Sequence, residues 1–255
     1  MLARHRQSLI LQAVRSDGSA RVSDLTQQLG VSDMTIRRDL EVLARDGLVE
    51  KVHGGAVLPG SHNAHEPGFE DKLVLERPEK TSIARAAAAL VRPGTAVAIS
   101  AGTTTFALAQ CLLDVPGLTI VTNSLRVANL FSGGRGPDGV SAVLTGGMRT
   151  ASDALVGPVA DLTIRSLHFD TLFIGCNGID PDAGLTTPNL AEAETNRALI
   201  KVARRVVVLA DHTKWGVVSL ASFASLDEVD VLVTDSLLPS EAHAALTGRI
   251  SEVVV

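Results

Sequence analysis

The stretch that decides the fold of the first part of the chain spans residues 22–57 and reads VSDLTQQLGVSDMTIRRDLEVLARDGLVEKVHGGAV. Two short helices are predicted within it. Ser23 is the expected N-cap of the first helix and Gly30 its end, while Ser32 caps the second helix and Gly47 ends it. The inner faces of the two helices are expected at Leu25, Leu29, Ile36, Leu40 and Leu43, which recur at helical spacing.

The flanking residues extend this helix pair to a larger motif. An apolar-periodic segment from about Ala3 to Ser16 precedes it, and Gly18 ends that segment. After it, residues 48–52 are typical of a strand, and Gly54-Gly55 of the turn of a small hairpin. Three helices with a tight turn between the second and third, followed by a hairpin, predict a winged helix-turn-helix, which is a DNA-binding fold.

The third helix carries the residues expected to read DNA. With Ile36 at the centre of the buried face, steps of about 100° per residue place Met34 and Arg38 on the opposite side, with Thr35 and Arg37 flanking them. Arginine can bind guanine through two hydrogen bonds, threonine can contact a thymine methyl group, and serine can reach a phosphate. The candidate DNA-binding residues are Ser32, Met34, Thr35, Arg37 and Arg38, with Lys51 and His53 on the hairpin and Arg4 and Arg6 as further phosphate contacts. Taken alone, two adjacent arginines are more often only a solvated helix surface.

Residues 22–57 closely resemble the N-terminal signature of DeoR-type bacterial repressors. The resemblance covers nearly the whole stretch and includes the core from Met34 to Leu40 and the His53-Gly54-Gly55-Ala56 segment. It implies that the partner is double-stranded operator DNA, that the regulated genes serve carbohydrate metabolism, and that the chain forms a homo-oligomer, either a dimer or a tetramer.

The chain changes character after residue 57. Residues 58–69 contain turn formers without apolar periodicity and are predicted to be a linker. From there to residue 255, short apolar runs alternate with helical patterns, which predicts an α/β domain with a mostly parallel sheet covered on both faces. The strands are expected at 95–100, 118–122, 140–144, 171–175, 206–210 and 231–234, and helices near 104–113, 124–131, 190–203 and 240–247. The predicted organisation is therefore a winged helix-turn-helix over 1–57, a linker over 58–69 and a larger α/β domain over 70–255.

Polar turns follow the first three predicted strands, at the strand ends where open parallel sheets bind ligands. The first is a glycine with three threonines at a helix start, where free backbone N–H groups and the helix dipole favour phosphate. The candidate effector residues in these turns are Gly102, Thr103, Thr104, Thr105, Thr122, Asn123, Ser124, Gly146, Gly147 and Arg149. A Gly-Thr turn that only caps its helix is the simpler alternative.

Asn177, Asp211 and Lys214 follow two later strands. Asp211 can bind a sugar hydroxyl and Lys214 a phosphate, although a surface ion pair would have the same spacing. This region resembles the effector domain of the DeoR-type family over about 185 residues, and that domain is similar in fold to ribose-5-phosphate isomerase. The resemblance implies a phosphorylated sugar as effector and adds Lys72 and Lys80 to its contacts.

Two positions depart from the family pattern. Ser100 stands where the family usually has an aspartate, and Asn196 stands where it usually has a lysine. The loss of one acid and one base is consistent with a changed effector or with neutral coupled drift.

Composition narrows the class of protein further. The net charge of −5 hides an asymmetry, because residues 1–57 carry a net charge of +1 and the remainder −6. Neither a signal peptide nor a run of about 18 apolar residues occurs, so a cytoplasmic protein without a membrane partner is expected. Cys111 and Cys176 are expected to be buried small hydrophobes. His62 and His65 have no third ligand nearby, so neither a metal nor a cofactor is expected.

Two other classes of function are alternatives to a sugar-responsive repressor. A sugar-phosphate isomerase needs a base and a group that stabilises the enediolate, but the matching region holds one acid, Asp180, and no glycine-rich loop follows. A DNA-binding protein whose larger domain only oligomerises would ignore sugar phosphates. The favoured hypothesis is an allosteric repressor. Without effector, its oligomer binds paired operator half-sites through the helix at 32–46. A bound sugar phosphate shifts the oligomer to a geometry that binds DNA poorly.

Overall fold

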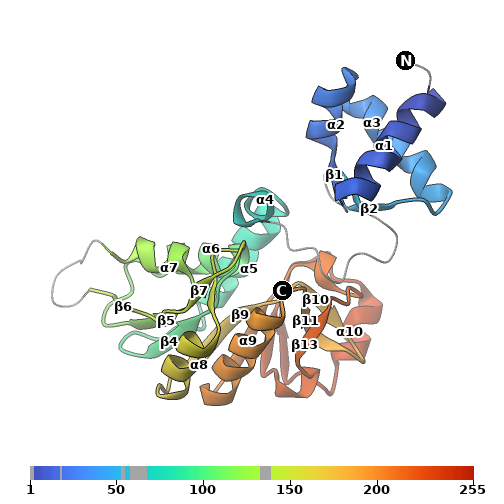
Figure 1. Cartoon of the computed structure of the whole chain (residues 1–255). Coiled ribbons are helices and arrows are strands. Elements are labelled where there is room, and N and C mark those ends of the chain that lie inside the picture. Colours follow the sequence, from blue (N-terminus) through green and yellow to red (C-terminus); the bar gives the residue numbers. More distant parts are fainter. Residues whose placement is uncertain (1–2, 18, 53–54, 58–67, 133–138) are drawn as a thin grey trace. The chain divides into compact units, whose positions relative to one another are not determined.

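The computed structural model describes residues 3–17, 19–52, 55–57, 68–132 and 139–255. The chain divides into two compact units, Met1–His65 and Glu66–Val255 (Figure 1). Most of the predicted linker over 58–69 lies outside the described residues, as do His53, Gly54, His62 and His65. Its last residue, Phe69, begins a helix of the larger unit.

The smaller unit consists of three helices and a three-stranded antiparallel sheet, as expected for a winged helix-turn-helix. The helices are α1 (Ala3–Asp17), α2 (Val22–Leu29) and α3 (Asp33–Arg45), and the strands β1 (Ser19–Arg21), β2 (Glu50–Val52) and β3 (Gly55–Val57) pair in the order β1-β3-β2. Strand β1 was not predicted, because three residues are too few to show an alternating pattern. The buried core consists of Ile10, Val14, Val22, Leu25, Ile36, Leu40, Leu43, Val49 and Ala56.

The ends of α2 and α3 test the predicted helix signals. The Oγ of Ser32 accepts a hydrogen bond from the backbone N–H of Thr35 at 3.3 Å, which confirms the predicted cap of α3. Gly47 has φ +68°, the left-handed conformation that favours glycine after a helix. Helix α2, in contrast, begins at Val22, so the prediction that Ser23 precedes the helix as its cap was wrong by two positions.

The larger unit is built on a seven-stranded parallel sheet in the order β15-β14-β12-β9-β4-β5-β6. Its strands are β4 (Ala96–Ile99), β5 (Thr119–Thr122), β6 (Ser141–Leu144), β9 (Thr171–Gly175), β12 (Val206–Leu209), β14 (Val231–Val233) and β15 (Glu252–Val254). The six predicted strands are confirmed. Strand β15 was missed because its apolar run, beginning after Glu252, is very short.

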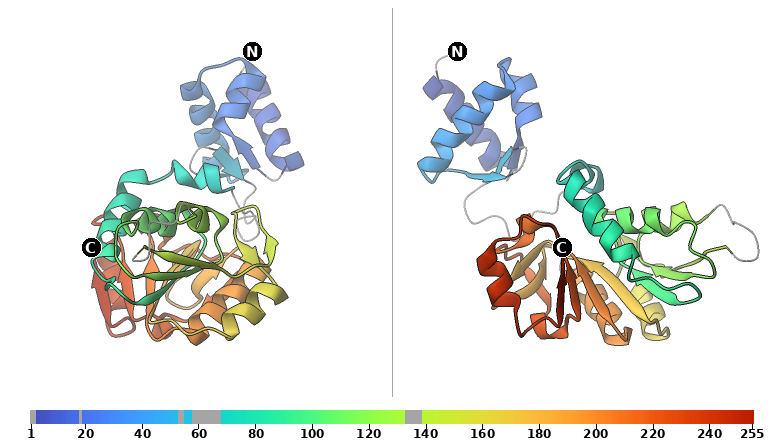
Figure 2. Two further views of the ribbon diagram at one scale, coloured as in Figure 1. Left: turned by 90° about the vertical axis from the view of Figure 1, so that its left-hand side faces the viewer. Right: turned by 180° about the vertical axis from the view of Figure 1, so that it is seen from behind.

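Helices cover both faces of this sheet (Figures 1 and 2). The helices are α4 (Phe69–Leu73), α5 (Arg77–Ala88), α6 (Thr103–Cys111), α7 (Leu125–Leu130), α8 (Pro158–Arg165), α9 (Leu190–Val202) and α10 (Ser240–Leu246). Ile83 of α5 and Leu108 of α6 pack on the face that also carries Val97 and Val207. Ile164 of α8 and Leu199 of α9 belong to the core of the opposite face. The predicted α/β domain with a mostly parallel, doubly covered sheet is therefore confirmed.

Shorter elements complete the larger unit. Strands β10 (Gly178–Asp180), β11 (Gly184–Thr187) and β13 (Ala221–Ala224) form a small antiparallel sheet, β7 (Met148–Arg149) pairs with β8 (Leu155–Val156), and η1 (His212–Lys214) and η2 (Leu226–Glu228) are single 3₁₀ turns. None of the described helices combines the length and the hydropathy needed to span a bilayer.

The two cysteines differ in exposure. The prediction that both are buried was wrong for Cys111, which is exposed at the last position of α6. Cys176 is half-buried, and burial raises the pKa of its thiol to about 12, so the thiol stays protonated.

Candidate functional site

Helix α3 of the smaller unit presents the residue types predicted to read DNA. Ile36, Leu40 and Leu43 are buried, while Met34 is 76% exposed and Arg38 is exposed on the outer side. Apolar side chains such as that of Met34 can contact thymine methyl groups in the major groove. The burial pattern thus places the predicted outward residues where a major groove could reach them.

The other candidates on α3 have partners within the helix. The hydroxyl groups of Ser32 and Thr35 lie 2.9 Å apart and can share a hydrogen bond. Arg37 Nε donates to Asp33 Oδ1 at 2.5 Å, and both side chains are about half exposed. An exposed pair of this kind contributes little to stability, so Arg37 can exchange Asp33 for a phosphate at small cost.

Helix α1 fixes α3 through a buried carboxylate that sequence reasoning missed. Asp39, 4% exposed, accepts hydrogen bonds from Arg6 Nε and, at 3.0 Å, from Gln7 Nε2. Arg6 is itself largely buried, so its expected role as a phosphate contact was wrong. Arg4 is exposed. Lys51 lies in β2, where only its backbone is described, and His53 lies outside the described residues.

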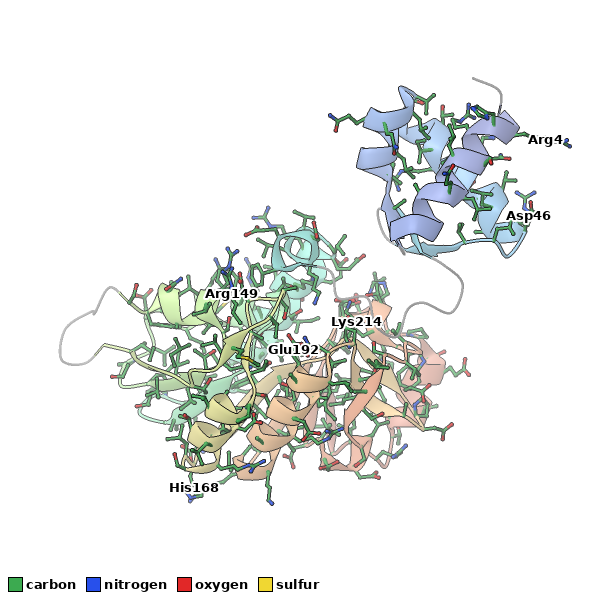
Figure 3. The ribbon with its side chains drawn as sticks, in the orientation of Figure 1. Arg4, Asp46, Arg149, His168, Glu192 and Lys214 are labelled. Carbon is green, nitrogen blue, oxygen red and sulfur yellow. The ribbon has the colours of Figure 1, made fainter. Side chains whose placement is uncertain are left out.

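In the larger unit, the predicted effector residues gather at the carboxyl ends of parallel strands. Most of them follow β4, β5, β6, β9 and β12, and these strands are neighbours in the sheet, while Lys72 and Lys80 lie on α4 and α5. Figure 3 labels Arg149 and Lys214 along one edge of the unit, with His168, which precedes β9, at the opposite edge. This is the edge at which open parallel sheets bind ligands.

Lys80, Asp211 and Lys214 form the centre of this edge. Lys80 is 6% exposed and Asp211 is 2% exposed. Burial lowers the pKa of Lys80 to about 8, while Asp211 acts to raise it and Lys214, together with Lys72, to lower it. The charges of Asp211, Lys214, Glu76 and Lys72 therefore all act on the Lys80 ammonium group.

The loop that carries Asp211 is held in place by its neighbours. Asp211 Oδ1 accepts from Thr213 N at 3.1 Å and from the Thr213 hydroxyl, and it caps η1. His212 N donates to the buried Asp235 at 2.8 Å. The second carboxylate oxygen, Asp211 Oδ2, is buried without a hydrogen-bond partner among the described residues. A buried charged oxygen without a partner is costly in a folded protein, and a ligand hydroxyl could satisfy it.

The polar side chains after β4 and β5 hold the strand ends together. Thr105 Oγ1 donates to the carbonyl of Ser100 at 2.7 Å, and Thr122 Oγ1 to that of Ile99 at 2.6 Å. Asn123 accepts from Ala101 N at 2.9 Å and donates to Leu155 O at 3.2 Å. Through these bonds, the predicted effector residues fix the positions of the strand ends at the candidate site.

The start of α6 and the start of α7 differ. Gly102 is the N-cap of α6 and provides no side chain, so the first N–H groups at Thr103 and Thr104 receive no side-chain cap. Ser124 caps α7 by accepting from Val127 N at 3.2 Å. Of the two helix starts, α6 is the one suited to an anion.

Arg149 belongs to a separate ion-pair network. Asp153, with 5% of its side chain exposed, accepts from Arg149 Nε and from Arg126 Nε, each at 2.6 Å. Burial would raise the pKa of Asp153, but the two arginines hold it below its usual value. Arg126 also pairs with Glu70 at 2.8 Å. The predictions from sequence missed Arg126 and Asp153, which lie far apart along the chain without a motif.

The remaining candidates have structural surroundings. A Cβ on Gly147 would lie 2.6 Å from the carbonyl oxygen of Val156, so this glycine allows a close backbone approach. Asn177 Nδ2 donates to Ser219 Oγ at 2.8 Å. Ser100 accepts from Gly175 N at 3.2 Å and so joins β4 to β9. Gly146 follows β6, and Asn196 is half-buried on α9.

Glu192 is a further partly buried acid that sequence reasoning left out. It lies in the first turn of α9, and its carboxylate accepts from Thr150 at 2.9 Å and from the Ser152 hydroxyl. These two hydroxyl donors belong to the β7–β8 turn, whose position the local sequence does not reveal.

Two family profiles match the chain. The DeoR-like helix-turn-helix domain matches residues 6–62, and the DeoR C terminal sensor domain matches residues 76–236.

Relatives match over nearly the full length. The chain is 34% identical to a putative aga operon transcriptional repressor of Escherichia coli O157:H7, covering 98% of this chain and 93% of the relative. It is 33% identical to the glycerol-3-phosphate regulon repressor of Escherichia coli K12, covering 96% and 95%. It is 37% identical to the HTH-type transcriptional regulator GlpR of Haloferax volcanii, covering 100% and 98%.

Solved structures match at low identity. The full-length sorbitol operon regulator SorC of Klebsiella pneumoniae is 13% identical, with a TM-score of 0.40 over 96% of this chain and 99% of that one. A D-ribose-5-phosphate isomerase in complex with phospho-erythronic acid is 14% identical, with a TM-score of 0.40 over 55% and 54%.

Proposed function

The chain belongs to the DeoR family of transcriptional regulators, and on that basis we propose that it is a repressor that leaves its operator when a phosphorylated sugar occupies the strand-end site of its larger unit. The full-length relatives carry the names of regulators and repressors, so the chain is a regulator rather than an enzyme.

The DNA-reading part of the proposal rests on α3. Met34 and Arg38 project from the side opposite the core, and Asp39 fixes the helix to α1. Arg38 and Arg37 supply charge and bidentate hydrogen bonding, while Ser32, Thr35, Lys51 and His53 are proposed as flanking contacts to phosphates and base edges.

The effector part rests on one observation above all. Lys80 and Asp211 are both almost fully buried at the carboxyl ends of the strands, and Asp211 Oδ2 lacks a hydrogen-bond partner there. A site with buried charges and an unsatisfied acceptor is arranged for a ligand that carries both a negative group and hydroxyl groups. A phosphorylated sugar has this chemistry.

The charges of the site assign the two ends of such a ligand. We propose that the phosphate lies near Lys80, Lys214 and Lys72, with the uncapped start of α6 as an additional donor. A sugar hydroxyl would donate to Asp211 Oδ2. Other family members are named for related ligands, as in the glycerol-3-phosphate regulon repressor.

Release from DNA requires that the ligand distinguish two states of the protein. We propose a homo-oligomer that reads paired half-sites without ligand and reads them poorly with ligand. A coupling free energy of about 1–3 kcal/mol, which changes operator affinity about 5- to 150-fold, is ordinary for such a switch.

The test is a thermal-shift screen of sugar phosphates on the full chain. A ligand present at about 100 times its Kd should stabilise the protein by about 2.7 kcal/mol. Each stabilising compound is then titrated into a complex of the protein with the duplex that it selects from a random-sequence pool.

Three outcomes separate the competing functions. Stabilisation followed by release of DNA supports the proposal. A protein that binds the selected duplex but responds to no sugar phosphate has a larger unit that only oligomerises, which contradicts the effector site. Turnover of a sugar phosphate would revive the isomerase alternative, but Asp180 Oδ1 accepts from Asp182 N and Ala183 N, each at 2.9 Å, and so shapes a turn.

A further inference from the structure

Helix α4 is the first described helix of the larger unit and cannot hold its position alone. It spans only Phe69–Leu73 and directly follows the stretch that joins the two units. Isolated helices shorter than about 12–15 residues are marginal in water. The position of α4 therefore depends on the side chains that contact it from neighbouring elements.

One of these side chains is Lys80. Its Nζ donates to the carbonyl oxygens of Lys72 and of Leu75, each at 2.6 Å. The last carbonyl groups of a helix have no partner within the helix, and here the ammonium group supplies one. The charges of Asp211 and Lys214, both in the proposed effector site, act on the same ammonium group. Lys80 thus belongs to both the end of α4 and the ligand site.

The beginning of α4 is held by side chains from α6 and α7. The ring of Phe69 meets that of Phe106 edge to face, with centroids 5.6 Å apart, and the Arg126 guanidinium lies 4.8 Å from the Phe69 centroid. Arg126 also pairs with Glu70 at 2.8 Å. Phe106 lies in the first turn of α6, and Arg126 in that of α7. Each end of α4 is therefore fixed to an element that carries proposed effector residues.

The joint between α4 and α5 is strained. Glu76 has φ +46°, a left-handed conformation that is uncommon outside glycine and costs on the order of 1 kcal/mol. Such a joint persists only because contacts on both sides hold it. Loss of the Lys80 ammonium bonds removes two contacts beside this joint, at Lys72 and Leu75.

Resting on the proposed function, we infer that α4 reports occupancy of the effector site, because a bound phosphate draws the Lys80 ammonium away from the carbonyl groups of Lys72 and Leu75. A hydrogen bond between two charged groups is stronger than one to a neutral carbonyl, so phosphate competes well for the three donors of the ammonium. The loosening of α4 is then the signal that the effector site is occupied.

Amide hydrogen exchange on the full-length protein tests this inference. In Lys80→Met, exchange of the amides at 72–76 should accelerate at least tenfold without any ligand, while that of β4 stays as in the wild type. In the wild type, saturating glycerol 3-phosphate should accelerate 72–76 at least threefold and slow 101–105. Lys201→Met is the matched control, since Lys201 is exposed on α9, and it should exchange like the wild type at 72–76.

A second variant covers the case in which Lys80→Met does not fold. Phe69→Leu keeps the apolar volume but removes the ring contacts, and it too should accelerate exchange at 72–76. It should still be stabilised by glycerol 3-phosphate, yet its binding to the selected duplex should respond less than half as strongly to that compound.

The possible failures are distinct. Unchanged exchange at 72–76 in a folded Lys80→Met, or in a wild-type protein that glycerol 3-phosphate clearly stabilises, overturns the role of α4 and leaves the effector site standing. If no phosphorylated probe stabilises the wild type, the proposed function fails and the inference fails with it.

Discussion

Two neighbouring arginines on α3 differ in whether their guanidinium groups have a partner within the helix. Arg37 is held by Asp33 at 2.5 Å, one turn away. Arg38 is exposed and makes no hydrogen bond or ion pair within the described residues. A guanidinium group that is already positioned on a rigid helix, without a partner to displace, is the better candidate for a base contact.

Replacing Arg38 by alanine should therefore remove specific DNA binding and leave the fold unchanged. A lost bidentate contact to a base should cost about 1–3 kcal/mol in affinity for the selected duplex. Gel-shift titration and thermal melting measure the two quantities. Arg92→Ala, a matched change at an exposed position of the larger unit, is the control. Wild-type affinity in Arg38→Ala would show that this side chain is only solvated surface.

Lys214 should affect the ligand and not the DNA. Lys214→Ala removes one positive charge from the proposed phosphate site, so the ligand should bind more weakly by about 1.5–3 kcal/mol. At least about tenfold more sugar phosphate should be needed to release the duplex, with ligand-free DNA affinity near the wild-type value. Titration of the preformed complex gives both numbers. Release at the wild-type dose would mean that Lys214 lies outside the site.

The lowered pKa of Lys80 makes ligand binding depend on pH. Burial lowers this pKa to about 8, with Asp211, Glu76, Lys72 and Lys214 as the facing charges. Below that pH the lysine is charged and attracts phosphate; above it the charge is lost. The Kd for the sugar phosphate should therefore rise about tenfold between about pH 7 and about pH 9.

Isothermal titration over this pH range measures the effect. Lys80→Met should bind more weakly and with a flat profile, because it has no proton to lose. Folding has the opposite pH dependence: the unfolded chain keeps this proton up to about pH 10.5, so ligand-free stability should increase between about pH 8 and pH 10.5. A Kd that is constant in the wild type would remove Lys80 from the phosphate site.

At the scale of helices and strands, sequence patterns succeeded where a signal was local. Apolar runs predicted six strands of the parallel sheet, and Ser32 and Gly47 predicted both ends of α3. Helix α5 was missed because its run of alanines, 84 and 86–89, offers no apolar contrast. Helix α4 was missed because five residues show no period, and its stability comes from contacts with distant elements.

The location of the candidate effector residues was also predictable in outline, because its signal is local. Strand-end turns can be located from the sequence, so the edge of the sheet at which these residues lie was predictable, while their contact with an effector stays a prediction. Which side chains face a ligand depends on tertiary bonds: Asn123 bonds Ala101 and Leu155 across the strand ends. The pairing of Asp153 with Arg126 spans 27 positions and has no local signature.

Gly147 was expected to contact the effector, and its geometry points to a packing role that can be tested. It has φ +119°, and an added Cβ would lie 2.6 Å from a backbone oxygen of Val156. Gly147→Ala should destabilise the larger unit by about 2 kcal/mol or more, because strain and overlap add. Gly94→Ala is the control: φ there is +74°, but an added Cβ meets nothing within 4 Å, so about 1 kcal/mol is expected. Equal melting temperatures for the two variants would contradict this account.

The whole molecule consists of two units with separate hydrophobic cores. Domains with their own cores commonly unfold independently. Scanning calorimetry of the full chain should therefore show two transitions, and a sugar phosphate should raise only the one that belongs to the larger unit. Arg38→Ala should leave both transitions in place. A single cooperative transition would mean that the units stabilise each other.

The contacts of Phe69 also set a rule for recombining this protein with other regulators. The boundary between the units falls at His65 and Glu66, but the ring of Phe69 packs on Phe106, well inside the larger unit. The DNA-binding unit of another regulator should therefore be joined before Gly68, so that α4 stays together with the larger unit that it contacts. A chimera built this way would direct the same chemical response to a different promoter, which is the working principle of a genetically encoded biosensor. One joined a few residues later would keep the strand ends that carry the proposed effector residues and lose α4 beside them.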